Sequence, residues 1–214
     1  MEPPEPWPLR HLVLRTPRLE LRPDDDAGLL ELAEEARLGV HPPDRMPFLH
    51  PWTDADPRYL GRGVLQYHWQ RRSALSPENW SVHFLVRHEG RVVGTQELAA
   101  ESFAVTREVV SGSWLGMRHQ GRGFGTEMRA AVLLFAFDVL GARAARSSAF
   151  ADNAVSLRVS AKLGYRPDGT QLRSRRGEPV VDTRLVLEPG DFVRPPWKPA
   201  TEGAEACLDL LGAS

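Results

Sequence analysis

Apolar and polar positions follow two rhythms along this chain, and each rhythm predicts one kind of element. Short runs with a period of two residues predict β-strands, whereas longer runs with apolar residues three and four positions apart predict amphipathic helices. Strands are expected at residues 12–22, 82–86, 92–99, 108–115, 144–151, 166–172 and 180–187. Helices are expected between Asp26 and Gly39, after Asp56-Pro57, from Thr126 to Leu140 and from Asn153 to Leu163.

The first strand is expected at the edge of a sheet. Leu12 to Leu14 and Leu19 to Arg22 alternate like strand residues, but Pro17 stands between the two stretches. Proline cannot donate to a strand ladder, so it is confined to edges and bulges. We therefore predict an edge strand interrupted at Pro17.

The helix from Thr126 to Leu140 has the clearest buried face. Five apolar residues recur on one side of it, at the i, i+3, i+4, i+7 and i+11 positions that face a core. They are Met128, Ala131, Val132, Phe135 and Val139. Gly141 ends this helix.

Strands and helices together predict a mixed α/β layer fold. Residues 1–9, rich in proline, are expected to form a loose arm, and residues 10–188 one folded domain. Prolines and small residues dominate after position 189, so residues 189–214 are expected to be a tail that is partly ordered or docks through a short helix at 204–211. The loop between Val40 and Pro57, with five prolines, is expected to be irregular but ordered.

Composition excludes several classes of protein. Of the 214 residues, 42% are hydrophobic and 26% are charged, which is ordinary for a globular protein. The net charge of −1 does not indicate binding to nucleic acid or to a membrane surface. The longest apolar run, residues 130–137, is too short to span a bilayer, and residues 1–6 are not expected to be a signal peptide, because they lack its basic and apolar regions. The single Cys207 excludes an internal disulfide, and no metal site is expected. We expect a cytoplasmic protein.

Glycines 121, 123 and 125 lie between a predicted strand and a predicted helix. Glycine lets the backbone bend sharply and approach a ligand, and the N-terminus of the next helix offers unpaired N–H groups and a positive dipole end. The loop therefore predicts a pocket for phosphate oxygens. It is not a P-loop, because it has no lysine, and its third glycine comes too early for a dinucleotide fingerprint.

Two spaced motifs resemble the GCN5-related N-acetyltransferases. One is the pyrophosphate loop Gln120-x-x-Gly123-x-Gly125, and the other runs from Asn153 through Ser156 to Leu163-Gly164-Tyr165. The opening Arg15-Thr16-x-Arg18-Leu19 is similar to that of the ribosomal-protein acetyltransferases of the RimJ/RimL type. The resemblance implies the fold of that family, a mostly antiparallel sheet that splays at the cofactor site and is flanked by helices.

The same resemblance implies a binding site for acyl-CoA, with acetyl-CoA or succinyl-CoA as donor. Backbone groups of Trp114, Leu115, Gly116 and Met117 would hold the pantetheine, and Gln120, Gly121, Arg122, Gly123, Phe124, Gly125 and Thr126 the pyrophosphate. Asn153 would bond the pantetheine amide, or act as a plain helix N-cap. Arg158 and Lys162 would meet the adenosine phosphates, or form a solvated helix face.

The resemblance also implies direct acyl transfer to a primary amine. Ser156 matches the serine that protonates the leaving thiolate in the ribosomal-protein branch. That branch has a glutamate three positions before the loop glutamine, where this chain has Met117. Glu97 and Glu108 on neighbouring strands are the candidates to replace this general base, and the histidines His83 and His119 are further ones.

Acceptor recognition is expected at the first two helices and the loop between them, with Phe48, Trp52 and Trp80 lining the pocket or simply packing. The acceptor is expected to be a small molecule or a protein, and a homodimer stays open. Because the family's glutamate is absent, a non-catalytic sensor or scaffold that binds acyl-CoA is an alternative. A nicotinamide- or nucleotide-binding domain is the third hypothesis.

Overall fold

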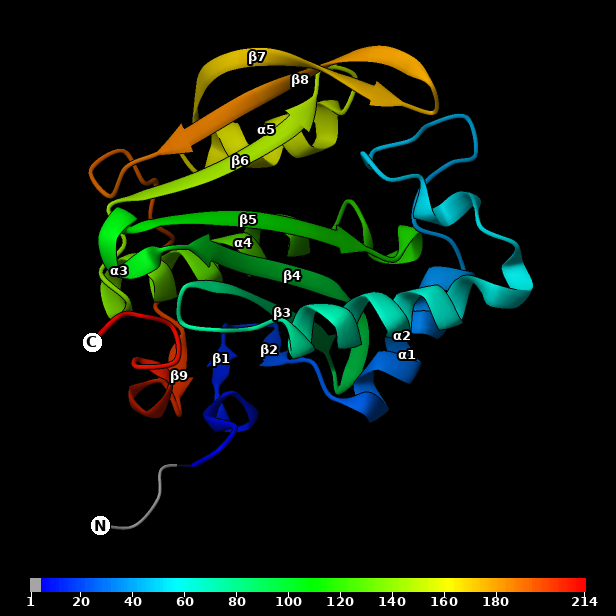
Figure 1. Cartoon of the computed structure of the whole chain (residues 1–214). Helices are drawn as coiled ribbons and strands as arrows, with labels where there is room; N and C mark the ends of the chain where they lie inside the picture. The colour runs from blue at the N-terminus through cyan, green and yellow to red at the C-terminus, as the bar shows by residue number, and fades with distance from the viewer. Residues whose placement is uncertain (1–4) are drawn as a thin grey trace.

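A computed structural model describes residues 5–214 and contains a nine-stranded sheet in the order β7-β8-β6-β5-β4-β3-β2-β1-β9 (Figure 1). The strands are β1 Val13–Arg15, β2 Glu20–Pro23, β3 Asn79–His88, β4 Arg91–Glu101, β5 Glu108–Leu115, β6 Ala144–Phe150, β7 Arg166–Arg175, β8 Glu178–Leu187 and β9 Ala200–Glu202. The helices are α1 Asp26–Arg37, α2 Pro57–Ser73, α3 Phe103–Thr106, α4 Phe124–Leu134 and α5 Ala154–Lys162. The predicted mixed fold is confirmed.

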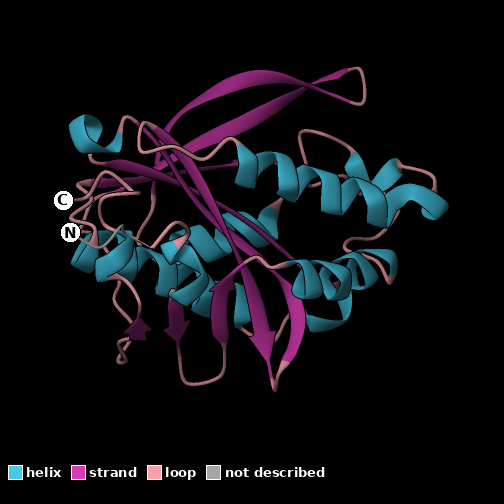
Figure 2. Ribbon diagram, turned by 60° about the horizontal axis from the view of Figure 1, so that its bottom comes forward, coloured by secondary structure: helices cyan, strands magenta, loops and turns pink. Residues whose placement is uncertain are grey.

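Helices cover both faces of the twisted sheet (Figure 2). Helices α1 and α2 pack on one face, where Leu29 and Leu60 share a cluster with Leu85 of β3. On the other face α4 packs against Phe84, the neighbour of Leu85. Successive strand residues point to opposite faces, so one strand serves both cores. Among residues 5–214 no helix is long and apolar enough to cross a membrane.

The sheet opens between β5 and β6, the one parallel pair among the described strands. Residues 108–110 of β5 pair with 144–146 of β6, and the two strands then diverge toward the glycine loop (Figure 1). Strand β5 continues to Leu115 along β4 alone, with Leu115 opposite Gly94. The predicted splay is therefore present, and the far end of β5 has a bare edge.

The opening of the chain differs from the predicted edge strand. Strands β1 and β2 form a tight antiparallel hairpin, with Leu14 opposite Leu21, and Pro17 lies in the turn between them. Strand β9 from the tail pairs with the outer side of β1. The prediction of one interrupted edge strand was wrong, because a proline in a turn leaves the same alternation on either side as a proline at an edge.

The long helix also departs from its predicted stripe. Regular α4 ends at Leu134, and residues 135–139 form a π-turn closed by Leu140 N donating to Phe135 O at 3.1 Å. The wider turn shifts the register, so Val139 is 38% exposed whereas Leu140 is 1% exposed. The first four residues of the predicted stripe are buried, and Val139 is the exception.

Both ends of the described chain pack on the sheet. Pro8 and Leu9, which we expected in a loose arm, are buried in a 3₁₀ turn, and residues 1–4 of that arm lie outside the described residues. In the tail, Cys207 and Leu211 are fully buried. The tail helix expected at 204–211 is a shorter 3₁₀ turn, Glu205–Cys207.

Candidate functional site

The glycine-rich loop presents a row of backbone N–H groups to its surroundings. Gly121 and Gly123 have φ of +74° and +83°, in the left-handed region that favours glycine. Within residues 5–214, the N–H groups of residues 121–125 donate to no protein acceptor, and no side chain caps α4. These groups, at the positive end of a helix dipole, form a site suited to phosphate oxygens.

A brace from the β1–β2 turn holds the first turn of α4. The buried carboxylate of Glu127 accepts hydrogen bonds from Thr16 Oγ1 at 2.6 Å and from Arg18 Nε at 2.7 Å. Arg18 Nη1 also donates to the carbonyl oxygen of Arg122 at 3.0 Å. The opening motif thus has a physical role, because it fixes the glycine loop from its outer side.

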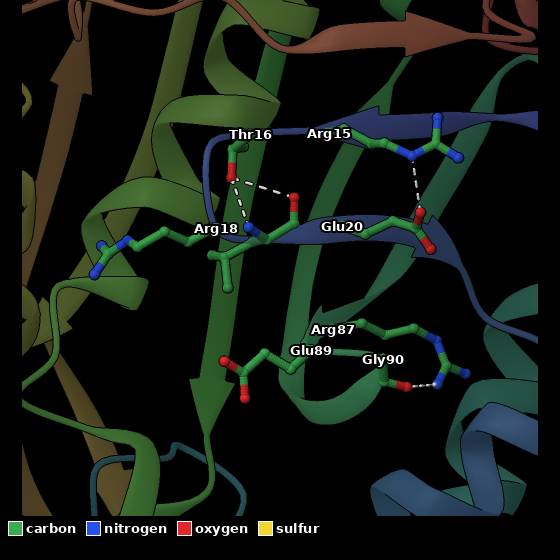
Figure 3. A pocket seen from close by; sticks show the side chains of 8 residues that line it. Arg15, Thr16, Arg18, Glu20, Arg87, Glu89 and Gly90 are labelled. Carbon is green, nitrogen blue, oxygen red and sulfur yellow. Dashed lines mark hydrogen bonds and ion pairs between the residues drawn. The ribbon is translucent and has the colours of Figure 1, made fainter.

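A hollow of about 280 Å³ lies between this turn and the β3–β4 turn (Figure 3). Three arginines line it, and each is engaged by a carboxylate of the protein. The pairs are Arg15 with Glu20 and Glu202, Arg18 with Glu127, and Arg87 with Glu31. Because the positive charges are already compensated, this hollow is not suited to an anion, and the bare N–H groups of the glycine loop are.

The strand end that leads into the loop is fixed by Gln120. Its side-chain Nε2 donates to Leu115 O at 2.9 Å and to Val40 O at 2.7 Å, so the amide holds the loop rather than reaching outward. Met117 N donates to Gly39 O at 2.9 Å. Backbone groups alternate between the two edges of a strand, so part of the β5 backbone faces the gap toward β6.

Helix α5 begins beside the same gap. Asn153 Oδ1 accepts from Ser156 N at 3.1 Å, which is an N-cap contact, while Asn153 Nδ2 donates to no described residue. Ser156 Oγ is likewise without a partner among residues 5–214. Arg158 and Lys162 are exposed on this helix. Asn153 therefore caps the helix and keeps a donor free at the same time.

The side chain of Glu97, on the neighbouring strand β4, lies above β5. It lies opposite Gly112 in the β4–β5 ladder, and a Cβ added to Gly112 would stand 2.9 Å from Glu97 Oε2. Because Gly112 has no side chain, the carboxylate of Glu97 can occupy the space above it. Among the described residues, Glu97 Oε1 accepts from Ser81 Oγ at 2.6 Å, whereas Oε2 accepts no hydrogen bond.

Behind Glu97 lies a buried polar group on β3. The hydroxyl proton of Ser81 goes to Glu97, so Ser81 Oγ accepts from His83 Nε2 at 3.1 Å, and the neutral ring carries its proton on Nε2. Burial lowers the pKa of His83 to about 4, although the charge of Glu97 opposes that shift. His83 is therefore neutral at pH 7 and orients Glu97 through Ser81.

A second carboxylate lies beside the start of the glycine loop. Glu35 of α1 is buried and bonds both Arg118 and His119, whose Nε2 is 3.3 Å from Glu35 Oε2. An added Cβ at Gly116 would stand 2.6 Å from Glu35 Oε2. Burial lowers the pKa of His119, while the charge of Glu35 opposes that shift. The sequence prediction missed Glu35, whose place three residues after Leu32 in an apolar stripe was the available signal.

Aromatic rings connect the loop after α1 to the wall of the gap. Phe48 and Trp52 are 5.2 Å apart between ring centroids, and Trp52 lies 5.4 Å from Trp114 of β5. On the other side of this loop, Arg176 in the β7–β8 turn forms a bidentate pair with Asp54 at 2.5 and 2.7 Å. The loop thus spans from α1 and α2 to the far arm of the gap (Figure 1).

Two predicted site residues lie elsewhere. Trp80 is buried in the core, 5.7 Å from Phe103 between ring centroids, and its Nε1 donates to Leu211 O at 2.9 Å. Glu108 lies at the closed end of the gap and bonds Arg146 through both oxygens, at 2.8 and 2.9 Å. This placement corrects both expectations: Trp80 does not line the acceptor side, and Glu108 does not reach the open end of β5.

Comparison with known proteins is consistent with this geometry. A family model described as an acetyltransferase (GNAT) domain matches residues 12–166. A structure of Mycobacterium smegmatis RimJ in complex with CoA-disulfide superposes with a TM-score of 0.67 at 17% identity, covering 94% of this chain and 95% of that one.

Two further solved structures share the fold. A GCN5-related N-acetyltransferase from Brucella melitensis has a TM-score of 0.66 at 18% identity, covering 88% of this chain and 83% of that one. A chimera of the spermidine N-acetyltransferase SpeG from Vibrio cholerae and hSSAT has a TM-score of 0.61 at 15% identity, covering 81% of this chain and 96% of that one. At such low identities the likeness concerns the fold alone.

Proposed function

This chain belongs to the GNAT acetyltransferase family, and from that premise we propose that it transfers an acyl group from acyl-CoA directly to a primary amine of a small molecule or protein. The observation that carries the proposal is the row of N–H groups at residues 121–125, ahead of α4, which donate to no acceptor in the described part of the chain. Phosphate oxygens bind such groups, and the pyrophosphate of CoA supplies them.

The pantetheine then runs from the glycine loop into the gap between β5 and β6. It takes the place of the strand partner that residues 112–115 lack on that side, as in strand addition at a sheet edge. Asn153 Nδ2, free among the described residues, donates to a pantetheine carbonyl. Arg158 and Lys162, exposed on α5, meet the adenosine phosphates.

Glu97 acts as the general base. The amine nitrogen attacks the thioester carbonyl carbon, and Glu97 Oε2 takes the proton that the amine loses. The C–S bond then breaks, and the thiolate takes a proton from the Ser156 hydroxyl. Glu97 releases the proton of the amine to solvent and Ser156 takes one proton back from solvent, so that the products are the amide and free CoA thiol and the enzyme returns to its starting state. The support for Glu97 is its free oxygen above Gly112, next to the proposed thioester position.

Transfer takes place without a covalent enzyme intermediate. The one cysteine, Cys207, is fully buried in the tail, and burial raises the pKa of its thiol to about 11. Such a thiol is neither exposed nor ionised at neutral pH. Both substrates therefore bind together, with the amine entering past Phe48 and Trp52 on the α1–α2 side.

The proposal is tested by a matched pair of glycine variants. Gly121 and Gly141 have φ of +74° and +71°, and an added Cβ at either one meets no atom within 4 Å. Gly121→Ala and Gly141→Ala therefore impose the same backbone strain of about 1–2 kcal/mol, but only Gly121→Ala places a methyl group where the pyrophosphate approaches. We expect equal losses of thermal stability in the two variants.

The readouts are binding of free CoA by calorimetry and release of free thiol from acetyl-CoA with a panel of amines. Gly121→Ala is expected to weaken CoA binding by about tenfold or more, and Gly141→Ala to leave it unchanged. Equal CoA affinity in both variants would place the cofactor elsewhere. CoA binding by the wild type with no thiol release for any amine would favour the non-catalytic sensor.

A further inference from the structure

Arg129 of α4 is a buried cation without a counter-charge among the described residues. Its side chain is 5% exposed, and none of the carboxylates among residues 5–214 lies within ion-pair distance of it. Its Nη1 donates to Ser160 Oγ at 2.9 Å and its Nη2 to Ser113 Oγ at 3.4 Å, while its Nε has no partner in the part of the chain that the structure describes. Neutral hydroxyls orient this guanidinium but do not compensate its charge.

Two other arginines of the protein give the contrast. Arg146 bonds Glu108 and Asp168, and Arg175 bonds Asp152 at 2.6 Å, although both are more exposed than Arg129. An unpaired charge in a water-poor interior is costly, and burial accordingly lowers the pKa of Arg129. The cost is removed when an anion binds beside the guanidinium, so a ligand is the expected source of the missing charge.

Arg129 lies beneath the gap, and its two hydrogen-bond partners define its position. Its partner Ser113 stands on the bare end of β5, and its partner Ser160 stands on α5, so the guanidinium bridges the two arms. On the same face of β5, Ser111 Oγ is 3.4 Å from the hydroxyl of Tyr165. A short row of hydroxyls and one cation therefore forms a polar floor under the gap, inside an otherwise apolar core.

On the proposed path of acyl-CoA, only one part of the two substrates reaches this floor. The pyrophosphate is assigned to the glycine loop, beyond the end of β5. The amine and Glu97 lie on the opposite face, because Glu97 stands over Gly112 and Gly112 points away from the side that Ser113 faces. On this path the acyl end of the donor enters the gap at the level of Ser113.

We propose that Arg129 selects an acyl-CoA whose acyl chain ends in a carboxylate, as in a succinyl group. This assignment rests on the proposed acyltransferase function and specifies its donor class. A guanidinium binds a carboxylate through two parallel hydrogen bonds, and the hydroxyl of Ser113 is placed to donate a third. An acetyl group has no atom that could meet the charge.

The first test needs no variant. Succinyl-CoA and butyryl-CoA have acyl chains of the same length, and only succinyl-CoA ends in a carboxylate. With one amine acceptor and thiol release as the readout, the wild-type kcat/KM for succinyl-CoA is expected to exceed that for butyryl-CoA by about tenfold or more, since a charge-assisted hydrogen bond contributes at that scale. Equal values, or a preference for butyryl-CoA, would overturn the assignment.

The second test uses Arg129→Met, which keeps much of the length without the charge, and Arg129→Lys, which keeps the charge. Arg129→Met is expected to abolish the preference for succinyl-CoA over butyryl-CoA while free CoA binds as tightly as to the wild type, and Arg129→Lys to retain part of the preference. An equal loss for both donors, or weaker binding of free CoA, would show that Arg129 serves the CoA body or the fold instead.

These assays distinguish a failure of the proposed acyltransferase function from a failure of the donor assignment to Arg129. If the wild type binds no CoA and releases no thiol from either donor, the proposed acyltransferase function falls and the donor assignment with it. If the wild type turns over both donors without preference, the function stands and the role of Arg129 alone is refuted.

Discussion

The two faces of β5 at the gap each carry one charged group, and the two groups differ in how they are bound. On the α1–α2 face, the carboxylate of Glu97 is held through one oxygen by Ser81, and the other oxygen is free among the described residues. On the α4–α5 face, the guanidinium of Arg129 is held by Ser113 and Ser160, and no described carboxylate pairs with it. The first arrangement suits a group that takes a proton, and the second suits a group that receives an anion.

Strand alternation creates this division. Gly112 and Ser113 are neighbours in the chain, yet Gly112 leaves space for Glu97 on one face and the hydroxyl oxygen of Ser113 accepts a hydrogen bond from Arg129 on the other. A thioester lying along the bare edge of β5 would have the base on one side and the cation on the other. One strand thereby separates the acceptor chemistry from donor selection.

The largest expected effect comes from removing the base. Glu97→Gln keeps the size of the side chain and its contact with Ser81 but cannot take a proton, so kcat is expected to fall by about 10²–10³-fold. The KM for the acyl donor is expected to stay unchanged, because the floor beneath β5 is untouched. Steady-state thiol release over a range of acyl-CoA concentrations measures both constants.

Glu108→Gln is the control, because Glu108 is engaged by Arg146 at the closed end of the gap. Full activity of Glu97→Gln, or an equal loss in Glu108→Gln, would remove Glu97 from the mechanism. Rescue of activity at high pH, where more of the amine is neutral, would support its role as the base.

A smaller effect is expected from filling the space that Glu97 uses. The methyl group of Gly112→Ala would stand 2.9 Å from Glu97 Oε2, so the carboxylate has to move. Misplacing a catalytic group costs rate, and we expect kcat to fall by about tenfold. Gly63→Ala in α2 is the matched control, since an added Cβ there meets no atom within 4 Å. Unchanged kcat in Gly112→Ala would mean that Glu97 is not used in this position.

The smallest effect concerns the pH dependence of stability. His83 has a pKa of about 4 in the folded state and about 6.5 when unfolded, so the unfolded chain binds more protons between these values. The free energy of unfolding is therefore expected to fall as the pH drops from 7 to 5, with about 2 kcal/mol of that loss due to His83. This contribution becomes constant only about one pH unit above the unfolded pKa of 6.5.

Urea unfolding of the wild type and of His83→Gln at pH 7 and pH 5 measures this contribution. The variant keeps a side-chain donor for Ser81 but has no group that titrates in this range. Its stability is expected to fall less than that of the wild type over the same interval. Equal slopes for the two proteins would show that the ring titrates normally and is not the buried, neutral partner of Ser81.

Helices and strands whose apolar and polar residues follow a clear local period could be predicted from the sequence. The bounds of β5 agree at Glu108–Leu115, and the glycine loop and the helix after it were found from spacing alone. The errors arose where one pattern fits two structures. Alternation of apolar and polar residues on both sides of Pro17 fits either an edge strand or a hairpin. The prediction that Val139 is buried required a regular α-helix through residues 135–139, where the structure has a π-turn.

Most of the candidate site depends on contacts that no local pattern reports. Glu35 meets His119 across 84 positions of the chain, and Arg129 meets Ser160 across 31. Glu97 stood out in the sequence only as one of several strand carboxylates, and its room above Gly112 became visible in the structure. Trp80 shows the reverse error, because a tryptophan expected at a surface pocket is covered by the tail.

The most direct test is an amide ¹⁵N–¹H titration of the full chain with free CoA. The N–H groups of residues 121–125, which have no acceptor within the described protein, are expected to show the largest shifts and to gain protection from exchange when the pyrophosphate binds. The Gly141 amide, in a similar left-handed turn, is expected to stay in place. Large shifts elsewhere with residues 121–125 unmoved would contradict the account.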